Sequence, residues 1–539
     1  MGMSRMGAKD GELIESVGQM VGKFTGELYP KLGMWEKRLM ESPESLEAIE
    51  REVQEAFLHG AGMITSGLIA VVLLSQELQR KSEETRRNFG YPLARGRNRD
   101  LRIRLLGGFF MWVSSLYCEP KKGVFRRARP EATGLYIELA QFGFGKGITP
   151  AVQSTVSRQA ALSPSFRFAA NELARNGLRL DAKSVRRISH QCGENLLELR
   201  KQRIVDWREK EMTPENSLAG KRVSVQIDGG RTRLRESLRP AIPASDNPDS
   251  DGLLQQDAAA RSKRVSKSSF APQWREPKLC TIFVHDEKGR MERHSQTTID
   301  GTFEGPDAIA ELVAMHLHRM GAARALSITF VADGAAWIWE RIDKIVELAG
   351  IPAEVAIHQV LDCCHGVHHV SLALASLGLN EAERMPLYRA MRTMLRNGQW
   401  KQVIDDLSDL AEDNQWPTSM ATEIEYLRKH GEAGRLSYVH FRKLGIPLGS
   451  GSIESSIRRV VNNRMKSNGM FWRAENAEAM LQLRCQVISD RWDESVAAMR
   501  NMNRRTSHGD WRWVPRPMNP KVEANKSDAQ KLTKSKGNT

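Results

Sequence analysis

Two aspartates stand where strands of the chain are expected to end. Residues 222–228 alternate between polar and apolar side chains up to Asp228, which two glycines follow. The run 327–332 leads in the same way to Asp333 and Gly334. This pattern predicts strands that carry a carboxylate to the edge of a sheet. A single Asp-Gly pair more often forms a turn than binds a ligand, because both residues favour turn geometry.

The order of the surrounding elements brings these aspartates together. The sequence predicts strands over 222–228, 279–285, about 292–299, 327–332 and 354–361, with a turn at 286–289 and a helix over 307–320. Three antiparallel strands, a helix and a strand-helix-strand unit follow the order of an RNase H-like mixed five-stranded sheet flanked by helices, in which the first and fourth strands are neighbours. Asp228 and Asp333 would then lie side by side. Such carboxylates repel each other unless a proton or a metal ion lies between them, and two Mg²⁺ ions about 3.5–4 Å apart need bridging oxygens of this kind.

Glu454 is the expected third carboxylate. Beside it runs an apolar stripe at helical spacing, formed by Ile453, Ile457, Val460, Val461 and Met465. Glu454 lies at the edge of this stripe, so that it would face the sheet rather than water. We expect Ser452 to cap the helix, and the helix dipole then favours the ionised form of Glu454.

Three further acidic or metal-binding positions have weaker patterns. Asp362 and His365 follow the last predicted strand, and either orient the metal ligands from behind or close a strand-to-helix turn. Asp300 is a lesser alternative carboxylate. A zinc site is not expected in this segment, because its cysteines and histidines lack finger-type spacing; they are Cys363, Cys364, His368 and His369.

Four motifs in this order resemble those of DDE-type insertion-sequence transposases, and most closely those of the ISKra family. They are Ile227-Asp228-Gly-Gly, Ala332-Asp-Gly-Ala-Ala-Trp337-Ile-Trp339, Leu361-Asp-Cys-Cys-His365, and Gly449-Ser-Gly-Ser-Ile-Glu454 with Arg464-Met-Lys466-Ser-Asn-Gly469-Met470-Phe-Trp472. The resemblance covers about 145–495 well and the N-terminal region loosely. It departs at Cys118, which stands alone where such transposases carry a cysteine pair or cluster, so it does not extend to a zinc-bound N-terminal module.

This resemblance implies an enzyme that moves DNA. Asp228, Asp333 and Glu454 would be both its catalytic acids and the ligands of two Mg²⁺ or Mn²⁺ ions. The implied reaction is hydrolysis of a phosphodiester at the transposon end, followed by attack of the freed 3′-OH on target DNA. The implied partners are double-stranded DNA, as end repeats and target, and at least one further copy of the chain. Two alternatives stay open: another RNase H-like nuclease of the resolvase type, and a domesticated DNA-binding protein without activity.

Several residues are candidates for contact with DNA. Arg464 and Lys466, on or just past the Glu454 helix, are expected to hold phosphates. Arg186 and Arg187 lie on the last of three helical stretches between 149 and 200, an arrangement typical of helix-turn-helix modules, although a solvated helix face explains them equally well. Tryptophans at such spacing more often lie in a core than stack on unpaired bases, and those concerned are Trp337, Trp339 and Trp472.

Composition supports a polyanionic partner and several domains. The 539 residues include 80 Lys and Arg against 65 Asp and Glu, a formal charge of +15, and 40% are hydrophobic. The six cysteines are scattered, which fits a reducing cytoplasm. The most apolar run, 64–74, is shorter than the ~20 residues that span a bilayer, and the N-terminus has no signal pattern. We therefore expect a bacterial cytoplasmic protein that acts at the nucleoid and makes no membrane contact.

The domain organisation follows from these patterns. We expect a helical N-terminal region (1–95), a hairpin-containing segment (96–145), a helix-turn-helix-like DNA-binding region (146–215), a catalytic domain (216–365 with 444–500) that includes a flexible basic loop (240–275), a helical insertion domain (366–443) and a disordered basic tail (514–539).

Overall fold

The computed structural model describes residues 10–505, apart from 90–91, 122–133, 145–146, 238–269, 414–416 and 468. The chain divides into two compact units, Met1–Leu199 with Glu494–Thr539, and Arg200–Asp493. The predicted tail over 514–539 and most of the predicted loop over 240–275 lie outside the described residues.

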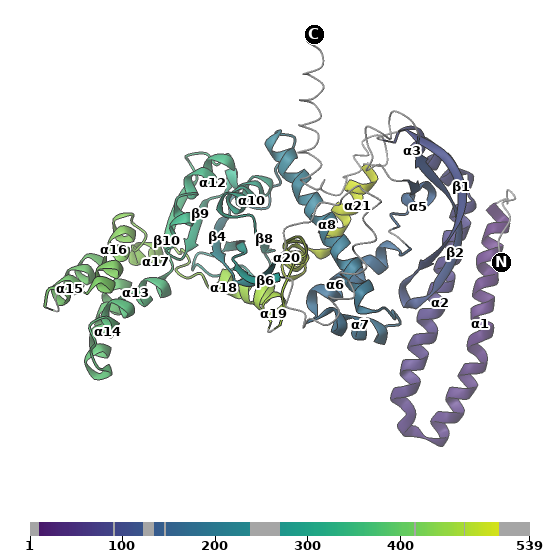
Figure 1. Cartoon of the computed structure of the whole chain (residues 1–539), viewed down its shortest axis with the longest axis horizontal. Coiled ribbons are helices and arrows are strands. Elements are labelled where there is room, and N and C mark those ends of the chain that lie inside the picture. Colours follow the sequence, from purple (N-terminus) through teal and green to yellow (C-terminus); the bar gives the residue numbers. More distant parts are fainter. Residues whose placement is uncertain are drawn as a thin grey trace, which may run out of the picture. The chain divides into compact units, whose positions relative to one another are not determined.

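A mixed five-stranded sheet forms the centre of the second unit (Figure 1). Its strands are β4 (Arg222–Gly229), β7 (Lys278–His285), β8 (Thr298–Thr302), β9 (Ser327–Ala332) and β10 (Ala356–Leu361), in the spatial order β10-β9-β4-β7-β8. β7 is antiparallel to both β4 and β8, whereas β9 is parallel to both β4 and β10. The predicted mixed α/β class with a five-stranded sheet is thus confirmed.

One predicted strand begins later than expected. We predicted a strand from about residue 292, but β8 begins at Thr298. Glu292 N–H instead donates to Val284 O at 3.0 Å, and Ser295 N–H donates to Glu292 O at 3.2 Å, so the residues before β8 form a turn.

Helices cover both faces of the sheet. They include α10 (Pro306–Arg319), η4 (Ala322–Arg324), α11 (Ala336–Trp339), α12 (Ile342–Leu348), α18 (Gly451–Ile457), η5 (Arg458–Asn462), α19 (Asn463–Met465) and α20 (Ala474–Ile488). Val225 and Ile282 share an apolar core with Val313 of α10. Gln226 and Thr281 alternate with them along β4 and β7 and therefore point to the opposite face, where α18 packs.

Helices fill the stretch between β10 and α18, where a helical insertion domain is predicted. They are α13 (Cys363–Ala375), α14 (Glu381–Arg396), α15 (Trp400–Asp413), α16 (Thr418–Glu432) and α17 (Tyr438–Lys443), and Figure 1 shows them grouped beside β10. Leu407 and Ile424 from these helices belong to the same buried cluster as Val360 and Phe330 of the sheet. The insertion therefore shares the core of the sheet and has no separate one.

A pair of antiparallel strands follows β4. β5 (Thr232–Ser237) pairs antiparallel with β6 (Phe270–Arg275). The flexible loop predicted over 240–275 is therefore wrong at its end, because Phe270–Arg275 is a strand held by cross-strand hydrogen bonds.

The first unit contains the helical N-terminal region. Its elements are α1 (Asp10–Glu41), η1 (Pro43–Ser45), α2 (Leu46–Leu74), α3 (Gln76–Arg87), β1 (Leu93–Arg104), η2 (Leu106–Gly108), β2 (Phe110–Pro120), β3 (Leu135–Tyr136), α5 (Ile137–Gln141), α6 (Pro150–Leu162) and α7 (Phe166–Arg175). α8 (Ala182–Arg208) and α21 (Trp492–Arg505) cross the division between the units. The predicted hairpin turn is present, with Gly107 and Gly108 at φ of 71° and 78°.

One helix is longer and more apolar than the sequence predicts. Pro43–Leu74 has the length and composition to cross a membrane, and its most apolar 18 residues have a mean hydropathy of 1.9, whereas the predicted apolar run covers only 64–74. Gly60 and Gly67 of α2 lie so close to α1 that an added Cβ would be 2.3 Å from the Phe24 ring and 2.5 Å from Met20 Sδ. A core helix of a soluble protein passes the same test, so this single helix is consistent with a soluble protein.

Candidate active site

The two predicted aspartates stand at the same edge of the sheet. β4 and β9 run parallel, with Gln226 opposite Val331. Two residues further along each strand the chain reaches Asp228 and Asp333. The predicted adjacency of the two strands is thus confirmed, and it brings both carboxylates to the carboxyl ends of neighbouring strands.

The electrostatics of Asp228 show which side chains surround it. Burial and the charge of Asp333 raise the pKa of Asp228 to about 6, and Glu454 adds to the rise. The N–H of Gly229, which donates to Asp228 Oδ1 at 2.6 Å, and the side chain of His365 both lower this pKa. The parallel strands β4 and β9 thus place Asp228 and Asp333 at one sheet edge. Glu454, from α18, and His365, from α13, act on the charge of Asp228.

Asp362 fastens the surrounding segments to one another. It is 1% exposed. Its Oδ1 accepts the N–H of His365 at 2.9 Å, which caps α13, and its Oδ2 accepts the N–H of Ser450. Its own N–H donates to Ala332 O at 2.8 Å. Asp362 thus closes the strand-to-helix turn and also holds the segment that leads to Glu454.

The Glu454 helix begins two residues earlier than predicted. The residue that precedes it is Ser450, not Ser452, and the Ser450 hydroxyl does not cap the helix by accepting a backbone N–H but donates to Glu454 Oε1 at 3.3 Å. The apolar stripe from Ile453 to Met465 is buried, as predicted. Beyond Ile457 the helix widens into a π-helical turn, a feature often found near functional sites.

Gln226 joins this helix to strand β4 by hydrogen bonds. Its side chain is 1% exposed, donates to Gly449 O at 3.0 Å and accepts the N–H of Ile453 at 3.0 Å. Sequence reasoning missed this residue. The available signal was an amide side chain inside a strand that is otherwise buried, two residues before Asp228.

Tyr426, from α16, reaches the site from the insertion. Its ring packs on Gly334, where an added Cβ would lie 2.0 Å away, and it stacks on His369 with centroids 3.5 Å apart. Its hydroxyl is buried, and no described group hydrogen-bonds it. Burial and the charge of Asp333 raise the pKa of Tyr426. No sequence signal links residues so far apart in the chain.

Two of the predicted DNA contacts are core residues. Arg464 is 2% exposed, and burial and the charge of Arg484 lower its pKa to about 10. Trp472 is 6% exposed, lies under the Arg464 guanidinium at 5.2 Å, and donates to Met465 O at 3.2 Å. The prediction that Arg464 holds a phosphate is therefore wrong, because its side chain is enclosed by protein.

The other predicted contacts are accessible to different degrees. Lys466 is exposed. Arg186 and Arg187, in the part of α8 that belongs to the first unit, are exposed as well. Trp337 is half-buried beneath Lys278, whose Nζ lies 4.4 Å from its ring. Trp339 is buried, and its indole donates to Asp333 O at 2.8 Å, which agrees with the expected core role.

Asp300, the alternative carboxylate, has a structural role. It is 1% exposed and pairs with Arg200 at 3.4 Å and with His316 Nε2 at 2.9 Å. Burial would raise the pKa of Asp300, but the His316 hydrogen bond and the Arg200 charge hold it below its ordinary value. A carboxylate neutralised in this way is a poor metal ligand.

The donor set at the sheet edge fits a hard divalent cation. Carboxylate oxygens suit Mg²⁺ and Mn²⁺. Burial, and then the charge of Asp333, raise the pKa of Asp228, and a bound cation would favour its ionised form. Among the described residues, no three His, Cys, Asp or Glu side chains already form a ligand cage. Side chains must therefore turn toward the ion for Asp228, Asp333 and Glu454 to share it.

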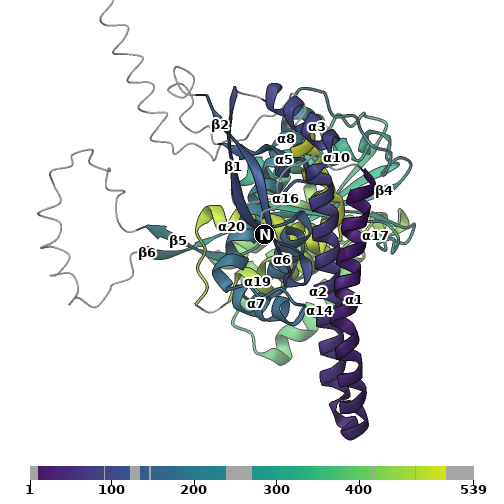
Figure 2. The same ribbon diagram turned by 90° about the vertical axis from the view of Figure 1, so that its right-hand side faces the viewer.

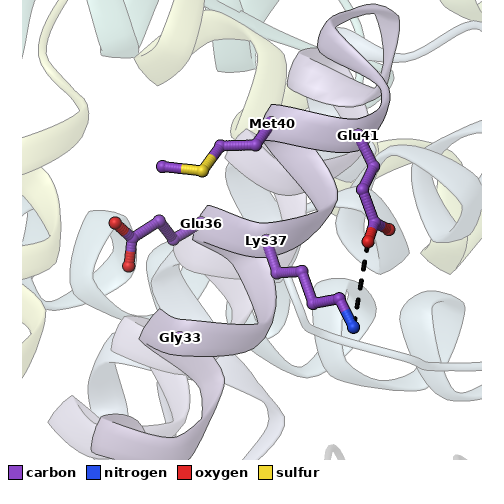
Figure 3. A pocket seen from close by; sticks show the side chains of 5 residues that line it. All are labelled: Gly33, Glu36, Lys37, Met40 and Glu41. Atoms are coloured by element: carbon purple, nitrogen blue, oxygen red, sulfur yellow. Dashed lines mark ion pairs between the residues drawn. The ribbon is translucent and has the colours of Figure 1, made fainter.

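A surface hollow on α1 has no comparable chemistry. Residues of this one helix line it, as Figure 3 shows: Gly33, Glu36, Lys37, Met40 and Glu41. Its ion pair, Lys37–Glu41 at 3.8 Å, joins two largely exposed side chains. We assign this hollow no catalytic role.

The chain matches no protein-family model, no curated protein and no solved structure.

Proposed function

We propose that this protein is a DDE-type DNA transposase resembling the ISKra family, with Asp228, Asp333 and Glu454 as its catalytic acids. The observation that carries the proposal is the pair of aspartates that the parallel strands β4 and β9 bring to one sheet edge. The first turn of α18, which carries Glu454, is hydrogen-bonded to β4 through Gln226. The strand order β10-β9-β4-β7-β8, in which β7 alone runs opposite to the other four strands, supports an RNase H-like catalytic domain. The formal charge of +15 supports a DNA partner.

In this proposal Asp228, Asp333 and Glu454 hold two Mg²⁺ or Mn²⁺ ions. When bound, the ions supply Lewis acidity that activates a water or a 3′-hydroxyl and stabilises the leaving oxygen. The role of the surrounding protein is to orient the ligand side chains. The N–H groups of Gly229 and Ala335 orient the two aspartates, at 2.6 and 3.1 Å.

The rest of the proposed machinery holds Glu454. Gln226 fixes both ends of the first turn of α18, and Asp362 holds the N–H of Ser450, whose hydroxyl contacts Glu454. These bonds are all buried or half-buried, so water does not compete freely for them. Arg186 and Arg187 on exposed faces of α8 are proposed to contact duplex DNA, and the active species is proposed to be a dimer or larger assembly in the bacterial cytoplasm.

The decisive experiment replaces one ligand and keeps its shape. Asp333→Asn should lower Mg²⁺-dependent cleavage of DNA carrying the sequences that flank the gene by about a thousandfold or more, because a neutral amide cannot hold the ion. Binding of the same DNA without divalent metal should change little. Asp409→Asn, an exposed aspartate of α15, is the matched control and should cleave as the unmodified protein does.

A second assay separates the proposal from a resolvase-type nuclease, which shares the carboxylates. A duplex with a pre-cut 3′-OH end should be joined to target DNA in the presence of Mg²⁺. Cleavage without joining would replace the transposase proposal by the nuclease. Full cleavage by Asp333→Asn would refute both, and DNA binding without either reaction would indicate a domesticated DNA-binding protein.

A further inference from the structure

Cations and aromatic rings alternate on one face of the β5–β6 hairpin. Figure 2 shows the two strands running side by side. The register pairs Arg233 with Trp274 and Arg235 with Pro272, so these side chains share a face. We call this the basic-aromatic face, and it comprises Arg233, Arg235, Phe270, Trp274, Phe471 and Lys466.

The cations of this face lie over its rings. The Arg233 guanidinium is 4.9 Å from the Phe471 ring centre and 5.4 Å from that of Trp274. Arg235 lies 4.5 Å from Phe270, and Lys466 Nζ lies 5.9 Å from Trp274. Arginine planes that rest on aromatic rings keep their outward N–H groups available to an anion.

The opposite face anchors the hairpin. Thr232 and Leu234 are buried, and the Thr232 hydroxyl donates to Met465 O at 2.6 Å. The backbone of β5 also forms two hydrogen bonds with that of Trp472. Arg235 N–H donates to Trp472 O at 2.7 Å, and Trp472 N–H donates to Arg233 O at 3.1 Å. An isolated two-stranded hairpin is marginally stable, so these contacts are what hold the basic-aromatic face in place.

The face carries charge and apolar surface that the described part of the protein does not satisfy. Within the described residues, no carboxylate pairs with Arg233, Arg235 or Lys466, whereas exposed arginines such as Arg80 have a glutamate partner. Trp274 is 57% exposed. Arg233 donates to Ser467 O at 3.1 Å, and cations without a described carboxylate partner beside an exposed indole are complementary to a polymer of phosphates and flat bases.

The hairpin stands next to the catalytic edge of the sheet. β5 begins at Thr232, four residues after Asp228, and Gly230 N–H donates to Pro277 O at 2.8 Å across the base of the hairpin. Lys278, at the start of β7, pairs with Gly229 and lies over Trp337, which follows Asp333 in the chain. A strand bound to the basic-aromatic face is therefore adjacent to the proposed reaction centre.

We propose that the basic-aromatic face binds a DNA strand with unpaired bases next to the phosphate that is cut. This inference rests on the proposed function and adds the form of DNA that the site requires. An exposed indole gains from stacking only when the base is free of its own duplex stack, whereas the arginines grip the phosphates of either form. The face thus prefers a frayed or single-stranded flank to a closed duplex.

The test compares two DNAs in the absence of divalent metal. Fluorescence anisotropy measures binding of the full chain to a duplex with a short unpaired flank and to a fully paired duplex of the same length. Trp274→Ala should weaken binding to the flanked DNA about tenfold and to the paired duplex less than about twofold. Trp274→Phe should restore most of the loss. Arg235→Ala should weaken both and reduce the salt slope by about one.

Matched controls remove the same groups elsewhere. Arg80→Ala removes an arginine that Glu77 already neutralises, and Tyr29→Ala removes a ring that is 81% exposed on α1. Both should bind both DNAs as the unmodified chain does. The proposal is overturned if Trp274→Ala binds each DNA as tightly as the unmodified chain does. It is also overturned if Trp274→Ala weakens binding to both DNAs by the same factor. Because no metal is present, this result is independent of whether Asp333→Asn abolishes cleavage.

Discussion

At the scale of single residues, Asp228 and Asp333 differ from Asp300, the buried acid of β8, in the groups that contact their carboxylates. Asp300 has Arg200 and His316 as partners. Asp228 and Asp333 accept backbone N–H groups, and no lysine or arginine among the described residues pairs with them. Backbone N–H groups orient a carboxylate without cancelling its charge. The sheet edge therefore retains the negative charge that a divalent ion requires.

Gln226 should be a positioning residue for Glu454. Gln226→Met keeps the volume but removes the side-chain donor to Gly449 O and one of the two acceptors of Ile453 N–H, which also donates to Ser450 O, at a cost of about 1–3 kcal/mol. The start of α18 should then loosen, and the Mg²⁺ concentration for half-maximal cleavage should rise while metal-free DNA binding stays unchanged. Metal titrations of the cleavage rate measure this shift.

Ser224 provides the control for that measurement. It is buried on the same strand, and its hydroxyl has no hydrogen-bond partner among the described residues. Ser224→Ala should leave the metal dependence unchanged. A Gln226→Met protein that is less stable but has the original metal dependence would show that Gln226 supports only the fold.

At the scale of elements, the sequence patterns that rest on local periodicity were the reliable ones. β4, β7 and β9 follow runs with clear strand character, and the stripe from Ile453 to Met465 is buried as its spacing predicts. β6 was missed because Phe270–Arg275 contains a proline and polar residues that are typical of linkers. Its partner β5 and its anchor Trp472 are distant in the chain.

The side chains that act across elements could not be predicted from the chain alone. Gln226 and Tyr426 gain their roles from residues more than seventy positions away. Arg464 looked like a phosphate ligand because it is basic and close to Glu454 in sequence. Its burial depends on how α19 packs in three dimensions, which the local pattern does not contain.

Helix α16 contains a pH-dependent contribution to stability at His430. This ring is 1% exposed and its Nδ1 accepts from Arg435 at 3.3 Å. Burial and the charges of Arg435 and Lys429 lower its pKa to about 4. The unfolded chain binds the proton near pH 6.5 and the folded chain does not, so stability is complete above that pH and is lost as the pH falls toward about 4.

Urea unfolding between pH 7 and pH 4.5 should show this loss, which amounts to about 3 kcal/mol over the full range. His430→Gln should lower stability at pH 7 but reduce the slope with pH. His294→Gln, which replaces an exposed histidine, should leave the slope unchanged. An unchanged slope in His430→Gln would show that other groups cause the acid sensitivity.

At the scale of the whole molecule, the division of the chain differs from the one expected from sequence. The five-stranded sheet and the helices over 366–443 lie in one compact unit and share one buried cluster, whereas the sequence predicts a separate helical insertion domain there. Tyr438 joins them directly, since its hydroxyl donates to Leu361 O at 3.1 Å. Tyr426, from the same helices, packs against Gly334, next to Asp333. The insertion is therefore part of the body that holds the acids.

A cavity created in the helices over 366–443 should therefore also destabilise the sheet. Leu407 is fully buried in α15, and Leu407→Ala should destabilise this unit by about 2–5 kcal/mol. Hydrogen exchange of the full chain should then accelerate in β9 and β10 as well as in α13–α16, because one core opens as one cooperative unit. Leu372→Ala, at a 40% exposed position of α13, should change neither region measurably. Faster exchange confined to 366–443 would instead indicate that these helices unfold independently of the sheet. Tyr426 would then lose its contact with Gly334 while the strands that carry Asp228 and Asp333 stay folded.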